Sequence, residues 1–424
     1  MKKILFILYT CCILLFPVSA QQIPSFKAND RIVFLGNSIT EGGHYHSYIW
    51  LYYMTHFPEL PLRIYNGGIG GDCASHMVFR FDSDIKIKKP TYLVCSFGMN
   101  DSGYDGYNKP GYDKYANKQV EYANTEFGKL QQQILADKKI KNVVLLGSSP
   151  YDENVKLEGV ETLHGKNETI KRIIEMQAEV AQKRGWGFVN FNTVMCELNK
   201  EIQQSDSTAT FCGGDRIHPD KDGHMVMAYL FLKAQGLAGK EVAYFHINAT
   251  NRKAMEERNC RITHIKNEND TISFSYLSRS LPFPVDTIPR WGTKGTARDA
   301  VRQVPFMQEM NQEIMKVTDL HGNFRVTIDG TEIGRWDGNE LSKGINLAEI
   351  TCTPQYQQSL SIMYLNEERC AIEKRLRQYM AMQYVFFKHR GLLFADNKAA
   401  LDAAKAERES HYLVKYLYLS LIHI

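Results

Sequence analysis

The sequence predicts an α/β fold with one parallel sheet, followed by a smaller α+β region. Between Arg31 and about Gly236, short β-rich runs alternate with longer amphipathic runs, which is typical of successive βα units. After Gly239 the pattern changes to paired β-rich runs and then to helix. A chain of 424 residues is also too long for one ordinary core, so at least two structural units are expected.

Five runs have the length and composition of buried strands, and helical runs lie between them. The strands are expected at RIVFLG (31–36), LRIYN (62–66), TYLVCSFG (91–98), NVVLLGSS (142–149) and GFVNF (187–191). Apolar spacing near 3.6 predicts helices at 46–57, about 115–138, 167–185 and 222–236. Because strands and helices alternate, the five strands should form one doubly wound sheet within residues 21–239.

The remainder of the chain, residues 240–424, is predicted to be an accessory α+β region. Paired β-rich runs around polar turns predict hairpins at 260–276 and 323–336, and helix is expected at 354–379 and 399–410. The last six residues, LSLIHI, match a translated frame of a transposon-end sequencing adapter. We therefore expect the natural chain to continue past Tyr418.

The first 20 residues predict a cleaved secretory signal peptide. Lys2 and Lys3 precede the apolar run ILFILYTCCILLF and then Pro17–Ala20, which is the order of charged, apolar and small residues in such signals. The apolar run is shorter than the roughly 20 residues that span a bilayer, so cleavage after Ala20 is favoured over an uncleaved anchor. We expect a secreted or periplasmic protein whose mature chain has no membrane span.

Composition and charge exclude some classes of partner and cofactor. Apolar residues make up 44% and charged residues 23%, close to an average globular protein. Without the two lysines of the signal segment, 49 basic residues face 47 acidic ones, a formal charge of +2 that predicts no nucleic-acid partner. The seven cysteines after residue 20 include no CxxC pair, so no metal site is expected. Cys196 and Cys212 either form a disulfide bond or are separate buried thiols.

A serine follows the first predicted strand. Gly36-Asn37-Ser38 places it at the carboxyl end of a parallel strand, where the turn into a helix exposes side chains to a cleft. Ser is also a common helix N-cap, so this motif alone is a weak signal.

Two further strand ends carry groups that can bind negative charge. Residues 66–72, NGGIGGD, form a glycine-rich turn whose backbone N–H groups can approach an oxyanion or a phosphate. The turn lacks the Lys-Ser/Thr ending of a P-loop, which argues against nucleotide binding. Gly98-Met99-Asn100-Asp101 places the amide of Asn100 at the same sheet edge.

A carboxylate and an imidazole lie three residues apart before the last helix of the first region. In Asp215-Arg216-Ile217-His218-Pro219, His218 has the chemistry to accept a serine proton while Asp215 fixes its tautomer. An isolated pair of this kind is more often a surface turn with a capping Asp. Its weight here comes from the other three motifs.

In this order and at this spacing, the four motifs resemble the signature blocks of SGNH (GDSL-like) hydrolases. The resemblance covers about residues 30–236 and implies a flavodoxin-like three-layer catalytic domain at 21–239. It implies Ser38 as nucleophile and Asp215 and His218 as the rest of the triad. The backbone N–H groups of Ser38 and Gly71 and the side chain of Asn100 would form the oxyanion hole.

One residue departs from the usual family pattern. The first block more often has Asp where Asn37 stands here. Asn can keep the local hydrogen bonds but not the charge, so a modest effect is expected.

The resemblance implies a carboxylic ester hydrolase that works by an acyl-enzyme and needs no cofactor. Predicted secretion and the absence of a long apolar lid favour a short acyl group, such as acetyl, on a polysaccharide or oligosaccharide. If the protein is an enzyme with another substrate, the alternative is hydrolysis of lipid or other small esters. If it is not an enzyme, the alternative is a catalytically inactive carbohydrate-binding protein. Trp291 and Trp336 are either glycan-binding or core side chains. No role is assigned to His44, His46, Asp72 and His76.

Overall fold

The computed structural model describes residues 22–269, 271–289 and 294–415. The expected signal peptide, Trp291 and the final six residues therefore lie outside the described residues. Five parallel strands form the main sheet, in the order β2-β1-β3-β4-β5 of flavodoxin-like proteins. They are β1 (Arg31–Gly36), β2 (Arg63–Gly68), β3 (Tyr92–Phe97), β4 (Asn142–Gly147) and β5 (Gly187–Asn190). The predicted fold class is confirmed.

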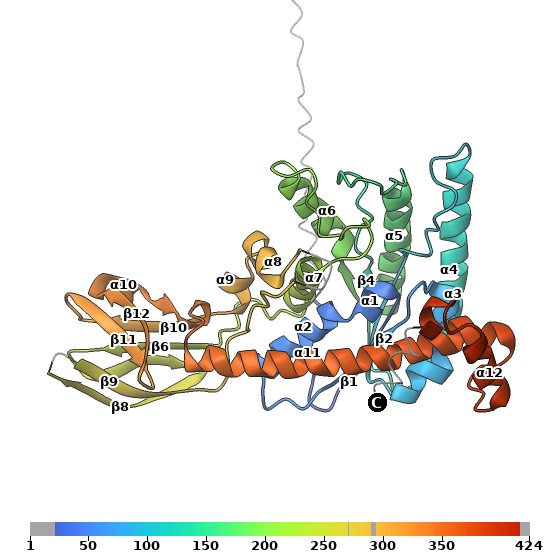
Figure 1. The fold of residues 1–424 in the computed structure, drawn as a ribbon. Helices are drawn as coiled ribbons and strands as arrows, with labels where there is room; N and C mark the ends of the chain where they lie inside the picture. Colours follow the sequence, from blue (N-terminus) through green and yellow to red (C-terminus); the bar gives the residue numbers. More distant parts are fainter. Residues whose placement is uncertain (1–21, 270, 290–293, 416–424) are drawn as a thin grey trace, which may run out of the picture.

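Helices cover both faces of this sheet (Figure 1). Ile32 and Phe34 of β1 pack on one face with α2 and α7, while Val33 and Leu35 pack on the other with α3 and α4. A strand buried on both faces has no polar alternation, which explains the continuous apolar runs in the sequence. The helices are α2 (His44–His56), α3 (Ala74–Arg80), α4 (Tyr112–Ala136), α5 (Lys166–Arg184), α6 (Phe191–Ile202) and α7 (Lys221–Ala234).

Three helices of this region were not predicted. α1 (Ser38–Gly42) and α3 have five and seven residues, too few to show a helical period. α6 begins directly after β5, with Asn190 as its N-cap. No loop residues separate the two elements, so the sequence shows no boundary between strand and helix.

The region after residue 240 contains a small mixed sheet and two hairpins. The two hairpins, β8 with β9 and β11 with β12, are antiparallel as predicted. The sheet, in the order β13-β10-β6-β7, was not predicted, because β10 pairs in parallel with β6 across a long stretch of sequence. Trp336 on β12 is half-buried and packs against the core of this region. The strands are β6 (Ala243–Asn248), β7 (Lys253–Arg258), β8 (Cys260–Glu268), β9 (Thr271–Ser278), β10 (Glu313–Thr318), β11 (Asn323–Ile328), β12 (Thr331–Asp337) and β13 (Ile345–Asn346).

Short helices complete the connections. They are η1 (Phe81–Ile85), η2 (Lys86–Lys88), α8 (Ala297–Gln303), α9 (Phe306–Met310), α10 (Gly338–Lys343), η3 (Leu347–Glu349), η4 (Met382–Phe387), η5 (Lys388–Arg390) and α12 (Lys398–Ala406). Within the described ranges, no helix has both the length and the apolar content to cross a membrane.

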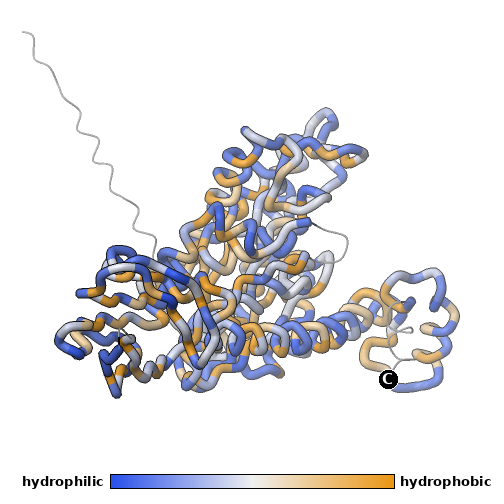
Figure 2. The backbone as a smooth tube through the Cα atoms, turned by 60° about the vertical axis from the view of Figure 1, so that its left-hand side comes forward, coloured by the Kyte–Doolittle hydropathy of each residue, from blue (hydrophilic) through white to orange (hydrophobic). Residues whose placement is uncertain are grey.

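The longest helix, α11 (Pro354–Ala381), joins the two regions (Figure 1). It begins in the small β region, after the N-cap Thr353, and runs along the main domain to the C-terminal helices. Figure 2 shows hydrophilic and hydrophobic positions following one another along it. The side chain of Asn366 donates to the Ser47 hydroxyl of α2 at 2.8 Å.

The end of α11 is attached to the main domain by a buried ion pair. The guanidinium of Arg377 donates to both carboxylate oxygens of Asp84 at 2.7 Å and to the Gly68 carbonyl at 3.0 Å. Burial alone would raise the pKa of Asp84, but its arginine partners hold that pKa well below the usual range. Arg377 therefore contacts the carboxyl end of β2 directly, and it is paired with a carboxylate that stays ionised.

Replacing Arg377 with Met should lower the free energy of unfolding by about 3 kcal/mol, because the buried Asp84 carboxylate loses a charged partner. Denaturant unfolding followed by circular dichroism measures this. Arg375→Met is the matched control, since Arg375 is exposed on the same helix and its loss should cost less than about 0.5 kcal/mol. Equal stability of the two variants would contradict the prediction.

Candidate active site

The turn between β1 and α1 presents Ser38. Asn37 is the N-cap of α1, and its side-chain oxygen accepts from the Ile39 N–H at 3.0 Å. The local hydrogen bond expected of an Asn at this position is therefore present. A Cβ on Gly36 would lie 2.0 Å from the Thr40 hydroxyl oxygen, so only glycine fits at the end of the strand.

The structure brings Ser38, His218 and Asp215 together. The Nε2 atom of His218 lies 2.8 Å from the Ser38 hydroxyl oxygen, and its Nδ1 atom lies 2.6 Å from a carboxylate oxygen of Asp215. Partial burial would raise the pKa of Asp215, but hydrogen bonds from His218 and from the Ile217 N–H lower it. An ionised carboxylate only accepts, so Nδ1 carries the hydrogen and Nε2 can accept the serine proton.

The turn that carries this pair is held by Arg216, which sequence reasoning did not identify. Arg216 has a positive φ of 70°, unusual for a residue with a side chain, and is 3% exposed. Its guanidinium donates to the carbonyls of Val155 at 2.6 Å and Asp152 at 3.1 Å. These bonds tie the turn of His218 to the loop after β4, which compensates for the strained backbone.

The predicted oxyanion donors lie at the same edge of the sheet. Gly71 has a left-handed backbone, with φ +79°, in the turn after β2. The neighbouring Gly70 N–H donates to the Glu41 carboxylate at 2.6 Å, and a Cβ on Gly70 would lie 4.0 Å from that of Ser38. In the described part of the chain, the Gly71 N–H has no such acceptor and remains available to a ligand.

The third donor, Asn100, lies across the site on the turn after β3. Its side-chain nitrogen donates to the Asp72 carbonyl at 3.0 Å, next to Gly71. The adjacent Asp101 is 3% exposed, and its two oxygens accept from the Ala74 and Gly98 N–H groups at 2.8 Å each. Asp101 therefore connects the start of α3, which follows the glycine turn, to the turn of Asn100.

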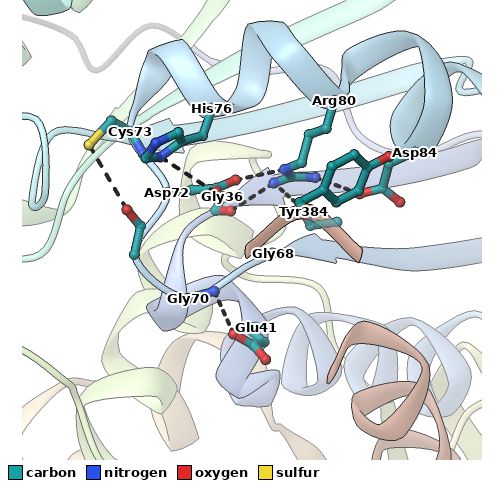
Figure 3. A network of polar contacts seen from close by, with 12 residues as sticks. Gly36, Glu41, Gly68, Gly70, Asp72, Cys73, His76, Arg80, Asp84 and Tyr384 are labelled. Carbon is teal, nitrogen blue, oxygen red and sulfur yellow. Dashed lines mark hydrogen bonds and ion pairs between the residues drawn. The ribbon is translucent and has the colours of Figure 1, made fainter. Parts of the chain in front are cut away.

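A buried arginine lies between Asp72 and Asp84, next to Gly36 at the end of β1 (Figure 3). Arg80 is 1% exposed and pairs with Asp72 and Asp84, each at 2.6 Å. It also donates to the carbonyls of Gly36 at 3.1 Å and Gly67 at 2.7 Å, at the ends of β1 and β2. In the sequence its only signal was the spacing of four residues to Asp84, which is ordinary for exposed helical pairs.

Two histidines to which the sequence assigned no role, His46 and His76, differ in exposure. His46 is fully buried, and burial lowers its pKa to about 4, so it is neutral. His76 is exposed on α3.

The cysteines that the structure describes form neither of the sites considered for them. Cys196 and Cys212 are separate thiols. Among the described residues, no three His, Cys, Asp or Glu side chains are grouped as a metal site requires.

Comparison with known proteins identifies the family of this chain. The GDSL-like lipase/acylhydrolase family matches residues 34–226, and the diltiazem deacetylase C-terminal helical domain matches residues 360–418. A gut microbial diltiazem-metabolizing enzyme of known structure is 49% identical, with a TM-score of 0.91 over 93% of this chain and 90% of its own. An acetylxylan esterase of Geobacillus stearothermophilus is 22% identical over 224 residues, 49% of this chain and 95% of that protein. This chain belongs to the GDSL-like lipase/acylhydrolase family and is a carboxylic ester hydrolase.

Proposed function

We propose that this enzyme is a serine deacetylase, with Ser38, His218 and Asp215 as its catalytic triad. The observation that carries the proposal is the continuous hydrogen-bonded path from the Asp215 carboxylate through His218 to the Ser38 hydroxyl. Ser38 attacks the ester carbonyl while His218 takes its proton and then gives it to the leaving alcohol. Water, activated by the same imidazole, hydrolyses the acetyl-enzyme and releases acetate.

The negative charge of the tetrahedral intermediate is stabilised by three donors. The backbone N–H groups of Ser38 and Gly71 and the side chain of Asn100 come from the ends of three neighbouring strands, β1, β2 and β3. Donors fixed by the fold need no reorganisation when the charge develops, which is why such groups accelerate acyl transfer.

The similar proteins favour acetyl as the acyl group. One is an acetylxylan esterase, and the more similar one metabolizes diltiazem and shares the C-terminal helical region, whose family is named for a diltiazem deacetylase. We propose that small acetylated compounds of the diltiazem kind are accepted. Acetylated carbohydrate is the second candidate, supported by the acetylxylan esterase and by the predicted export of the chain to the periplasm or the medium.

Acetate release from p-nitrophenyl acetate, diltiazem and acetylated xylan tests the proposal. The mature protein should release acetate from the first two, and its Ser38→Ala variant should release none above background, because the nucleophile is gone. Release from xylan at a comparable kcat/KM would favour the carbohydrate. The proposal of a serine deacetylase would be rejected if the wild-type protein were inactive on all three substrates, or if the Ser38→Ala variant were active.

Replacing Asn100 with Ala should lower kcat by about 10²- to 10³-fold with little change in KM, since one oxyanion donor is lost. Steady-state kinetics on p-nitrophenyl acetate measure this. Asn117→Ala, an exposed position on α4, is the control and should match the wild type. Full activity of the Asn100 variant would remove it from the oxyanion hole.

Replacing Asp215 with Asn should lower kcat by about 10³- to 10⁴-fold, because an amide can favour the wrong tautomer of His218. The pKa of Asp215 is lowered, so this carboxylate stays ionised as the pH falls into the acidic range and the loss should be similar wherever the wild type is active. A pH–rate profile of both proteins checks this. Recovery of the variant at high pH would argue against the tautomer role.

A further inference from the structure

Both ends of the Asn100 side-chain amide are hydrogen-bonded within the protein. Its nitrogen donates to the Asp72 carbonyl at 3.0 Å, and its oxygen accepts from the Tyr104 hydroxyl at 2.8 Å. A backbone carbonyl can only accept, so the nitrogen has to face Asp72. An amide nitrogen carries two hydrogens, and the second one is available for an oxyanion.

The Tyr104 hydroxyl is suited to this contact. Tyr104 is half-buried in the turn after β3, and burial raises the pKa of its hydroxyl, which therefore remains a donor. A donor beside the Asn100 oxygen favours the same amide orientation that the Asp72 carbonyl requires. Two independent partners thus select one of the two orientations of a group that could otherwise rotate.

The backbone on either side of Asn100 is held by a buried lysine. Lys166, the first residue of α5, is fully buried, and its Nζ donates to the carbonyls of Met99 at 2.9 Å and Gly103 at 2.6 Å. Its Nζ also lies 3.8 Å from the centre of the Tyr104 ring, within cation–π range. Burial lowers the pKa of this amine to about 7, and its hydrogen-bond partners, Met99, Ser102 and Gly103, all belong to the turn of Asn100.

We propose that Tyr104 and Lys166 are positioning residues that hold the Asn100 amide in the orientation that donates to the oxyanion. The inference rests on the proposed function, since it assigns the two residues to the same reaction. Neither residue belongs to the hydrogen-bonded path of the triad. Catalytic donors need this support because a displaced or rotated amide stabilises the transition state poorly.

A double-mutant cycle tests the proposal with p-nitrophenyl acetate as substrate. Tyr104→Phe should lower kcat about tenfold in the wild-type background, with KM within about twofold, since it removes one orienting hydrogen bond. In the Asn100→Ala background the same change should have no further effect on kcat, because the group that Tyr104 orients is absent. A substrate contact or a general structural role would instead persist in both backgrounds.

Tyr107→Phe is the matched control. Tyr107 lies on the same turn and its hydroxyl donates to the Ser102 carbonyl at 2.7 Å, but it makes no hydrogen bond with Asn100. This variant should keep kcat within about twofold of the wild type. A tenfold loss in the control as well would overturn the specific role of Tyr104.

Lys166→Met tests the second residue, because Met keeps an apolar side chain of similar length and lacks the N–H donors. It should lower kcat about tenfold in the wild-type background and not in the Asn100→Ala background. If this variant fails to fold, Tyr104→Phe decides the proposal alone.

The outcomes separate this inference from the proposed function. An inactive wild type would reject the proposed function, and a fully active Asn100→Ala variant would reject the oxyanion assignment along with this inference. With both of those intact, Tyr104→Phe at wild-type kcat, or with the same fractional loss in both backgrounds, would overturn this inference alone.

Discussion

The architecture of the site depends on one buried carboxylate. Asp84 is fully buried and shared by Arg80 of the main domain and Arg377 of α11. A buried charge that loses a partner is costly, so these groups have to remain together. Because Arg80 also donates to the carbonyls of Gly36 and Gly67, near the carboxyl ends of β1 and β2, the turns of Ser38 and Gly71 share one anchor. The nucleophile and its glycine turn are therefore placed by the same interaction that attaches the C-terminal helix.

The sequence predicted the sheet and the groups at its edge well. Both faces of the strands are buried, which leaves apolar runs that are easy to recognise, and parallel strands place their carboxyl ends side by side. A residue just after such a strand, as Ser38 is, can therefore be located before the rest of the fold is known. Ser38 and His218 are 180 positions apart, yet the structure places their side chains in contact. Their catalytic role remains a proposal.

The attachment of α11 was beyond sequence reasoning for a physical reason. The residues that fix it to the main domain include Asn366 and Arg377, both polar and both 3% exposed, so buried apolar positions such as Met363 do not continue as a stripe along the helix. The support of Asn100 was missed in the same way, because Lys166 at the start of a helix resembles an ordinary exposed lysine. The role of a buried polar group can be recognised only once its hydrogen-bond partners are known, and here those partners lie far away in the sequence.

The distance between Asp84 and Arg377 along the chain, 293 positions, has a consequence for biosynthesis. A ribosome completes the whole five-stranded sheet long before it adds α11. Domains tend to fold in the order of synthesis, so the sheet can assemble while one partner of Asp84 is still missing. Closing a loop of this length is a slow, late event compared with local pairing. The nascent chain should therefore complete the contacts beneath this edge of the sheet only once α11 has been made, well after the five strands have been synthesised.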